Sequence, residues 1–223
     1  MALVRKIKRI LRSRYRNLKS KNLALQDGAY HTKYDVIHYT ERCGWKQFGA
    51  KDEPEYERWW QEACGIVSLQ TVTNAIKPEQ HTEHTIFEQI QQAIQDGAYL
   101  QYNRGTEIVS VGWIHDKLAD IAEERQVRGY SANLRLAAIC QSIVENKLVI
   151  ASVYRPFVRF TLKDAPRKKR GGHLVVVKGF IWKNGHCKGL FVEDPYDING
   201  RTEPIEAQLF EDVYSGSAIV FYS

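Results

Sequence analysis

Residues 59–69 of the chain read WWQEACGIVSL, and at Cys64 this stretch changes to an apolar helical pattern. The pattern stops before Pro78, which predicts a helix over residues 64–76 because proline cannot continue a helix. A cysteine in the first turn of a helix meets unpaired backbone N–H groups and the positive end of the helix dipole, and both favour a thiolate. The sequence therefore indicates Cys64 as a candidate nucleophile.

Two residues far along the chain suit the needs of such a nucleophile. His173 follows a pair of glycines and precedes the apolar run 174–181, and Asp194 ends a second apolar run at 189–193. Both runs are typical of buried strands. Acyl transfer by a cysteine needs an imidazole to exchange protons with the thiol, and an acceptor that holds the imidazole in the right tautomer. We therefore expect Cys64, His173 and Asp194 to act together as a catalytic triad.

Nearby side chains of the same types are weaker candidates for these roles. His186 lies beside a glycine in a predicted turn, where a histidine is usually exposed, and Asp197 lies beyond the end of the predicted strand. A cysteine is more often a packing residue than a nucleophile. We expect that structural role for the three other cysteines, Cys43, Cys140 and Cys187.

The bulk composition is that of one soluble globular domain, with 223 residues of which 43% are apolar and 26% charged. No apolar run approaches the roughly 20 residues of a membrane span, and the basic start lacks the apolar stretch of a secretion signal. We therefore expect a cytoplasmic protein. The cysteines form no C-x-x-C pair, and His81 and His84 have no third ligand nearby in the sequence. We expect no metal site and no cofactor.

The positive charge is concentrated at the start of the chain. Residues 1–22 hold nine Lys and Arg and no acid, so the remaining 23 basic and 26 acidic residues give the rest a net charge of −3. Residues 3–18 predict a cationic amphipathic helix, so we divide the chain into a basic helix and linker over 1–28 and one catalytic domain over 29–223. The helix either packs on the domain or binds an anionic membrane surface or an acidic partner. Nucleic acid is a less suitable partner, because the basic stretches carry few aromatic residues.

The order of predicted elements indicates an α+β fold, with a helical half followed by a sheet half. Residues 49–57 read as a loop, and the basic cluster 163–170 as a solvated loop at the rim of the site. Further helices are predicted at 85–94, 111–124 and 134–146, and strands at 34–39, 148–154, 174–181, 189–193 and 218–222.

Three stretches, 63–69, 172–180 and 192–196, together resemble the C39-like branch of the papain-like cysteine peptidases. The resemblance implies a papain-like fold, in which a helical N-terminal half packs on an antiparallel β-sheet C-terminal half. It also implies that Cys64 is the nucleophile, His173 the general base and Asp194 the residue that orients it. A peptide or protein is then the expected substrate.

The family also uses a glutamine before the cysteine to complete the oxyanion hole. The usual offset falls on Arg58, so the sequence leaves two candidates: Gln47, which is preferred if residues 50–60 form an inserted loop, and Gln61. Trp60 and Gly172 flank the predicted catalytic residues and are candidates for binding substrate.

The function expected from the sequence is hydrolysis of peptide bonds through a thioester acyl-enzyme. Two alternatives stay open. The same triad transfers the acyl group to an amine or thiol in an acyltransferase or ligase, if the cleft excludes water. The same fold serves as a catalytically silent peptide-binding module if the thiol is unreactive.

Overall fold

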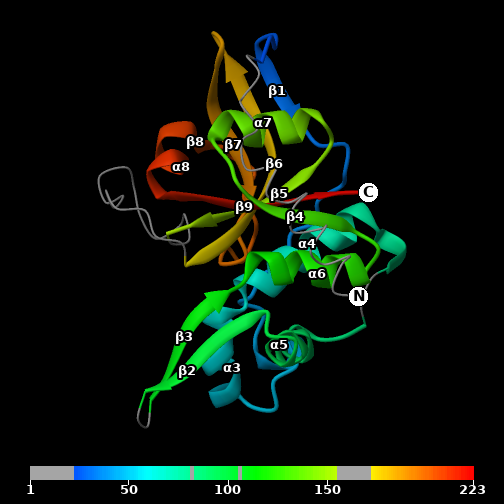
Figure 1. Cartoon of the computed structure of the whole chain (residues 1–223), viewed down its shortest axis with the longest axis vertical. Helices are drawn as coiled ribbons and strands as arrows, with labels where there is room; N and C mark the ends of the chain where they lie inside the picture. The colour runs from blue at the N-terminus through cyan, green and yellow to red at the C-terminus, as the bar shows by residue number, and fades with distance from the viewer. Residues whose placement is uncertain (1–22, 81–82, 105–106, 155–171) are drawn as a thin grey trace, which may run out of the picture.

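The computed structural model describes residues 23–80, 83–104, 107–154 and 172–223 (Figure 1). The predicted basic helix at 3–18 and the basic cluster at 163–170 lie outside the described residues. The helices are α2 (Trp45–Phe48), α3 (Glu53–Trp59), α4 (Cys64–Ile76), α5 (Ile86–Gln95), α6 (His115–Glu124), α7 (Leu136–Val144) and α8 (Ala207–Val213), with 3₁₀ turns at Trp60–Glu62 and Pro78–Gln80. The strands are β1 (Gly28–His31), β2 (Tyr99–Arg104), β3 (Glu107–Trp113), β4 (Arg128–Asn133), β5 (Leu148–Val153), β6 (His173–Lys183), β7 (His186–Glu193), β8 (Ile205–Glu206) and β9 (Tyr214–Tyr222).

Seven of the described strands form one antiparallel sheet in the order β4-β9-β5-β6-β7-β8, with β1 beside β6. The long strand β6 has two neighbours on one side. Its first half pairs with β5, where His173 lies opposite Val153, and its second half pairs with β1, where Trp182 lies opposite Gly28. Strands β2 and β3 form a separate hairpin that extends away from the sheet (Figure 1).

The sheet is buried on both faces by helices. Leu148 and Ile150 of β5 belong to a core with residues of α4, α5 and α6, whereas Val149 and Ala151 belong to a second core with residues of α7 and α8. Figure 1 shows these two groups of helices on opposite sides of the sheet. Successive side chains of a strand point to opposite faces. Because both faces of β5 are buried, its side chains are apolar at successive positions from 148 to 151. The predicted α+β fold class is confirmed, with helices on both faces of the sheet.

Helix α4 is the central helix of the first core and begins at Cys64, as the sequence predicts. Every residue from Cys64 to Asn74 is buried. The hydroxyl of Ser68 donates a hydrogen bond of 3.1 Å to the carbonyl oxygen of Leu174, which joins the first turns of α4 to the first residues of β6. No helix within the described ranges is long and apolar enough to cross a membrane.

Two predictions near the start of the domain are wrong. Residues 34–39 form no strand. They are held by the ring of His38, which contacts Glu193 and the carbonyl oxygen of Asp197 at 2.8 Å each. Residues 53–57, predicted as loop, begin α3, because Asp52 caps the helix and Pro54 occupies its first turn, where proline is tolerated.

The predicted helix at 111–124 is half wrong. Residues 107–113 form β3, and α6 begins only at His115. Val111 and Ile114 have the spacing of a helix with Leu118, but Gly112 has a φ of +116°, which a helix does not allow. The edge strand β4 and the hairpin partner β2 were not predicted. Residues 23–27 of the predicted linker have no regular structure, and Gly28 begins β1.

Candidate active site

Cys64 is the first residue of α4 and is 4% exposed. The residue before it, Ala63, has no side chain that can accept a hydrogen bond from the N–H groups at the start of the helix. The indole of Trp113 covers the next residue closely, since a Cβ placed on Gly65 would lie 2.5 Å from that ring. Trp113 also donates a hydrogen bond of 2.7 Å to the carbonyl oxygen of Glu62. The first turn of α4 is therefore fixed by contacts with Trp113, the last residue of β3.

His173 and Asp194 meet across two neighbouring strands. The Nε2 atom of His173 lies 2.6 Å from Oδ1 of Asp194, and the two side chains are 6% and 1% exposed. The backbone N–H of Tyr196 donates a second hydrogen bond to the same carboxylate oxygen, at 3.0 Å. Because Nε2 of His173 is hydrogen-bonded to Asp194, Nδ1 is the ring nitrogen that remains to interact with Cys64.

The surroundings of His173 favour its cationic form. Burial lowers the pKa of the ring, but the charge and hydrogen bond of Asp194, followed by the interaction with the Cys64 thiol, raise it more. The pKa of His173 therefore lies well above its ordinary value of 6.5. An imidazolium at this place stabilises a neighbouring thiolate and can protonate a leaving group.

A second polar cluster lies next to Asp194, at the end of β7. Glu193 precedes Asp194 and accepts hydrogen bonds from His38, at 2.8 Å, and from Lys178 of β6. Burial raises the pKa of Glu193, but these two partners lower it more, so the net shift is downward. This cluster fixes the end of β7, from which Asp194 projects.

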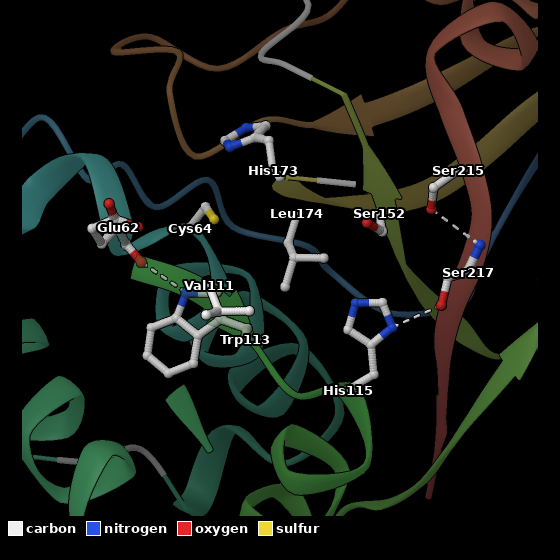
Figure 2. A pocket seen from close by; sticks show the side chains of 12 residues that line it. Glu62, Cys64, Val111, Trp113, His115, Ser152, His173, Leu174, Ser215 and Ser217 are labelled. Carbon is white, nitrogen blue, oxygen red and sulfur yellow. Dashed lines mark hydrogen bonds between the residues drawn. The ribbon is translucent and has the colours of Figure 1, made fainter. Parts of the chain in front are cut away.

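Cys64 and His173 lie at one end of an open pocket of about 530 Å³ (Figure 2). Both the helix α4 and the sheet contribute to its walls, and Trp113 and Leu174 lie along it. Within the described residues, no group of three His, Cys, Asp or Glu side chains is placed to hold a metal ion. The full lining is Glu62, Cys64, Val111, Gly112, Trp113, His115, Ser152, Gly172, His173, Leu174, Ser215 and Ser217.

The other predicted site residues are divided between the pocket and its surroundings. Gly172 lines the pocket. Trp60 is not among the lining residues, and its ring packs beside Tyr56 and Tyr196. A role of Trp60 in binding substrate stays a prediction. Gln47 lies on α2 and not after a strand, and both Gln47 and Gln61 are exposed and outside the lining. An oxyanion role for either glutamine stays a prediction.

Sequence reasoning missed Trp113, Glu62 and His115 as lining residues. The apolar helical spacing across residues 111–121 concealed the hairpin that brings Trp113 to the site. One signal was available, because Gly112 beside an aromatic residue is typical of a strand irregularity. His115 had no signal of its own, since a single histidine at the start of a helix is common.

No protein-family model matches the sequence, and no curated protein matches it. One similar solved structure is a double glycine motif protease from an AMS/PCAT transporter, in complex with the leader peptide. It is 14% identical with a TM-score of 0.46, over 86% of this chain and 93% of that chain. Another is the peptidase domain of Streptococcus ComA, a bifunctional ABC transporter of a quorum sensing pathway. It is 15% identical with a TM-score of 0.45, over 72% of this chain and 90% of that chain. Both of these solved structures are thus protease or peptidase domains of transporters.

Proposed function

We propose that the protein is a cysteine peptidase in which Cys64 is the nucleophile, His173 the general acid and base, and Asp194 the residue that orients His173. The buried contact of 2.6 Å between His173 and Asp194 carries this proposal. It fixes the ring with its other nitrogen available, at the end of the pocket where Cys64 begins a buried helix.

The proposed reaction has two halves. The thiolate of Cys64 attacks the peptide carbonyl carbon, and the C–N bond breaks as Nδ1 of His173 gives its proton to the leaving amine. A water molecule then attacks the thioester while neutral His173 takes a proton from it. The C–S bond breaks, the carboxylic acid leaves, and the thiolate of Cys64 and the imidazolium of His173 are restored. In this proposal the backbone N–H of Cys64, at the start of α4, stabilises the negative oxygen of each tetrahedral intermediate.

The first test is removal of the nucleophile. Cys64→Ala is expected to abolish hydrolysis of a mixed peptide substrate, while the circular dichroism spectrum and the thermal unfolding midpoint stay close to those of the wild type. Cys43→Ala is the matched control, because Cys43 is a free, half-buried cysteine outside the pocket. Peptide hydrolysis that survives in Cys64→Ala would refute the proposal.

The two alternatives give different results in related measurements. An acyltransferase or ligase would yield mainly the amide product when a peptide substrate is turned over in the presence of added amines, whereas a peptidase yields mainly the acid. In a silent binding module, iodoacetamide would label Cys64 slowly and at a rate unaffected by His173→Ala. Fast labelling that depends on His173 supports a reactive cysteine.

A further inference from the structure

The end of the pocket away from Cys64 is lined by polar side chains. His115 begins α6, Ser152 lies on β5, and Ser215 and Ser217 lie on β9 (Figure 2). The triad uses none of them. They line the same cavity as the thiol of Cys64, so a substrate side chain that entered this end of the cavity would contact them.

The serines stand where the pattern of the sheet predicts core residues. On the face that carries α4 and α6, β5 presents Leu148, Ile150 and then Ser152, and β9 presents Phe221, Ile219 and then Ser217. Ser152 is only 5% exposed. A buried hydroxyl costs stability relative to an apolar side chain unless it has a partner. Packing alone therefore does not explain why serine, and not an apolar residue, occupies positions 152 and 217.

The backbone is irregular at the same place. Ala151 pairs with Ala218 and Val153 with Tyr214, so one residue of β5 lies opposite three residues of β9. The middle one, Gly216, has a φ of +88°, and its carbonyl oxygen accepts a hydrogen bond of 2.9 Å from the backbone N–H of Leu134. Bulges of this kind are frequent beside functional sites, where they redirect side chains.

Within the part of the chain that the structure describes, one ring nitrogen of His115 has a hydrogen-bond partner. Its Nδ1 atom lies 3.0 Å from the hydroxyl oxygen of Ser217. Figure 2 shows the other ring nitrogen on the side that faces Leu174, away from Ser217. Burial lowers the pKa of His115, with only a partial opposing effect from the charge of Asp116. The ring is therefore neutral at pH 7 and offers one hydrogen-bonding nitrogen to the cavity.

Among the described residues that line this end of the pocket, none carries a charge at neutral pH. Glu62 is the acidic residue of the lining, and Figure 2 shows it on the far side of Cys64 from His115. An ionised substrate side chain would lose its hydration there without meeting an opposite charge. Hydroxyl groups and a neutral imidazole both donate and accept hydrogen bonds, and an uncharged carboxamide has the same capacity.

We propose that His115, together with Ser152, Ser215 and Ser217, forms a subsite that binds the carboxamide side chain of an asparagine or glutamine in the peptide substrate. His115 is the residue that determines this specificity, through the ring nitrogen that Ser217 leaves available. The inference rests on the proposed peptidase function, because it assumes that a peptide extends along the pocket from Cys64.

The test uses internally quenched peptide libraries in which one position at a time is fixed as Asn, Leu or Asp. Leu has nearly the shape of Asn without its hydrogen bonds, and Asp adds a charge. At the substrate position whose side chain enters the subsite, the wild type is expected to cleave the Asn pool with a kcat/KM about tenfold above that of the Leu pool. The kcat/KM of the Asp pool is also expected to lie below that of the Asn pool. His115→Phe, which keeps a ring but removes both nitrogens, is expected to bring the Asn and Leu pools within about twofold.

Two further variants keep the test decisive. Ser152→Ala removes a single hydroxyl and is expected to reduce the preference for Asn even if His115→Phe does not fold. His186→Phe is the matched control, since His186 lies on β7 outside the pocket and is exposed. It is expected to leave the preference unchanged. Equal cleavage of the Asn and Leu pools, a preference for Asp, or an Asn preference unmoved in both pocket variants overturns the subsite.

A binding measurement separates this inference from the peptidase proposal. The same pools are titrated against Cys64→Ala and against Cys64→Ala/His115→Phe by fluorescence anisotropy. If the wild type cleaves no pool but Cys64→Ala binds an Asn pool more tightly than its Leu pool, and His115→Phe removes the difference, the peptidase proposal fails and the subsite stands. If peptides are cleaved but Asn and Leu pools bind and react alike, the subsite alone fails.

Discussion

Asp194 acts on His173 in two ways. Its carboxylate occupies Nε2 and so fixes the tautomer and the direction of Nδ1, and its charge keeps the pKa of the ring well above 6.5. A substitution that keeps the shape of Asp194 but removes its charge separates the proposed catalytic role of this side chain from its contribution to packing.

Asp194→Asn is expected to reduce kcat by a factor on the order of 10² to 10⁴, with KM little changed, because the amide favours the wrong tautomer and no longer stabilises the imidazolium. Steady-state kinetics on a peptide substrate measure this. Asp197→Asn is the control, since Asp197 pairs with Arg201 and not with His173. Comparable losses in the two variants would contradict the assignment of Asp194.

His38 is a second histidine whose protonation is predicted to matter, in this case for stability. Burial lowers the pKa of His38, but hydrogen bonds to Glu193 and to the carbonyl oxygen of Asp197 raise it more, so the folded value lies above 6.5. A raised pKa means that the stabilising contribution is complete below pH 6.5 and is lost as the pH rises through the folded value. His38→Gln is therefore expected to lower the free energy of unfolding by about 1–2 kcal/mol at pH 6 and by less at pH 9. Urea unfolding of wild type and variant at the two pH values tests this, and a loss that grows with pH would contradict it.

Single residues differ in how far the sequence predicts their placement. Cys64, His173 and Asp194 could be selected because each stands at a boundary between a patterned element and a turn, where the pattern itself fixes the direction of the side chain. Gln47 lies on the single-turn helix α2, and Trp60 and Gln61 lie in the 3₁₀ turn before α4. These elements are too short for a hydrophobic period to set the direction of a side chain. Trp113 reaches Gly65 through a contact between residues far apart in the sequence, and no local signal encodes such a contact.

At the scale of elements, the junction of α4 with β3 depends on Gly65. Alanine favours a helix by about 1 kcal/mol over glycine, yet a Cβ at this position would lie 2.5 Å from the ring of Trp113. Gly65→Ala is therefore expected to destabilise the protein by about 1–3 kcal/mol through overpacking.

A double-mutant cycle isolates that contact. In the Trp113→Ala background the ring is absent, so Gly65→Ala is expected to be neutral or slightly stabilising, and the two substitutions are expected to be strongly non-additive. Free energies from urea unfolding give the coupling. An equal cost of Gly65→Ala in both backgrounds would mean that the ring is not what selects glycine here.

The elements that were predicted and those that were missed differ in how they are stabilised. The helix at 86–95 has a capping box between Thr85 and Glu88, and β5 has an apolar run. Both elements can therefore be recognised from their local sequence. The edge strand β4 alternates only weakly, and α6 begins without a side-chain cap. The residues at which β4 and α6 begin and end are set by contacts with distant parts of the fold, and the local sequence carries no signal of those contacts.

For the whole molecule, the two cores share the strands of a single sheet. Phe210 of α8 is fully buried in the second core, on the opposite face from Cys64. Phe210→Ala is expected to lower the free energy of unfolding by about 3–5 kcal/mol in one cooperative transition. The rate at which iodoacetamide labels Cys64 under native conditions is expected to stay within about twofold of the wild type. Calorimetry and labelling followed by mass spectrometry measure the two effects, and two separate unfolding transitions would show that the cores are independent.

The position of β9 has a consequence for biosynthesis. This strand follows all its sheet neighbours in the sequence but lies between β4 and β5 in space. While the chain emerges from the ribosome, β4 and β5 therefore have no partner for the edges that face each other, and the apolar side chains of β5 have an incomplete core. Unpaired strand edges and exposed apolar surface are what general chaperones bind. A chain that ends before Tyr214 is therefore expected to be prone to aggregation, because β4 and β5 then lack the strand that joins them in the folded sheet.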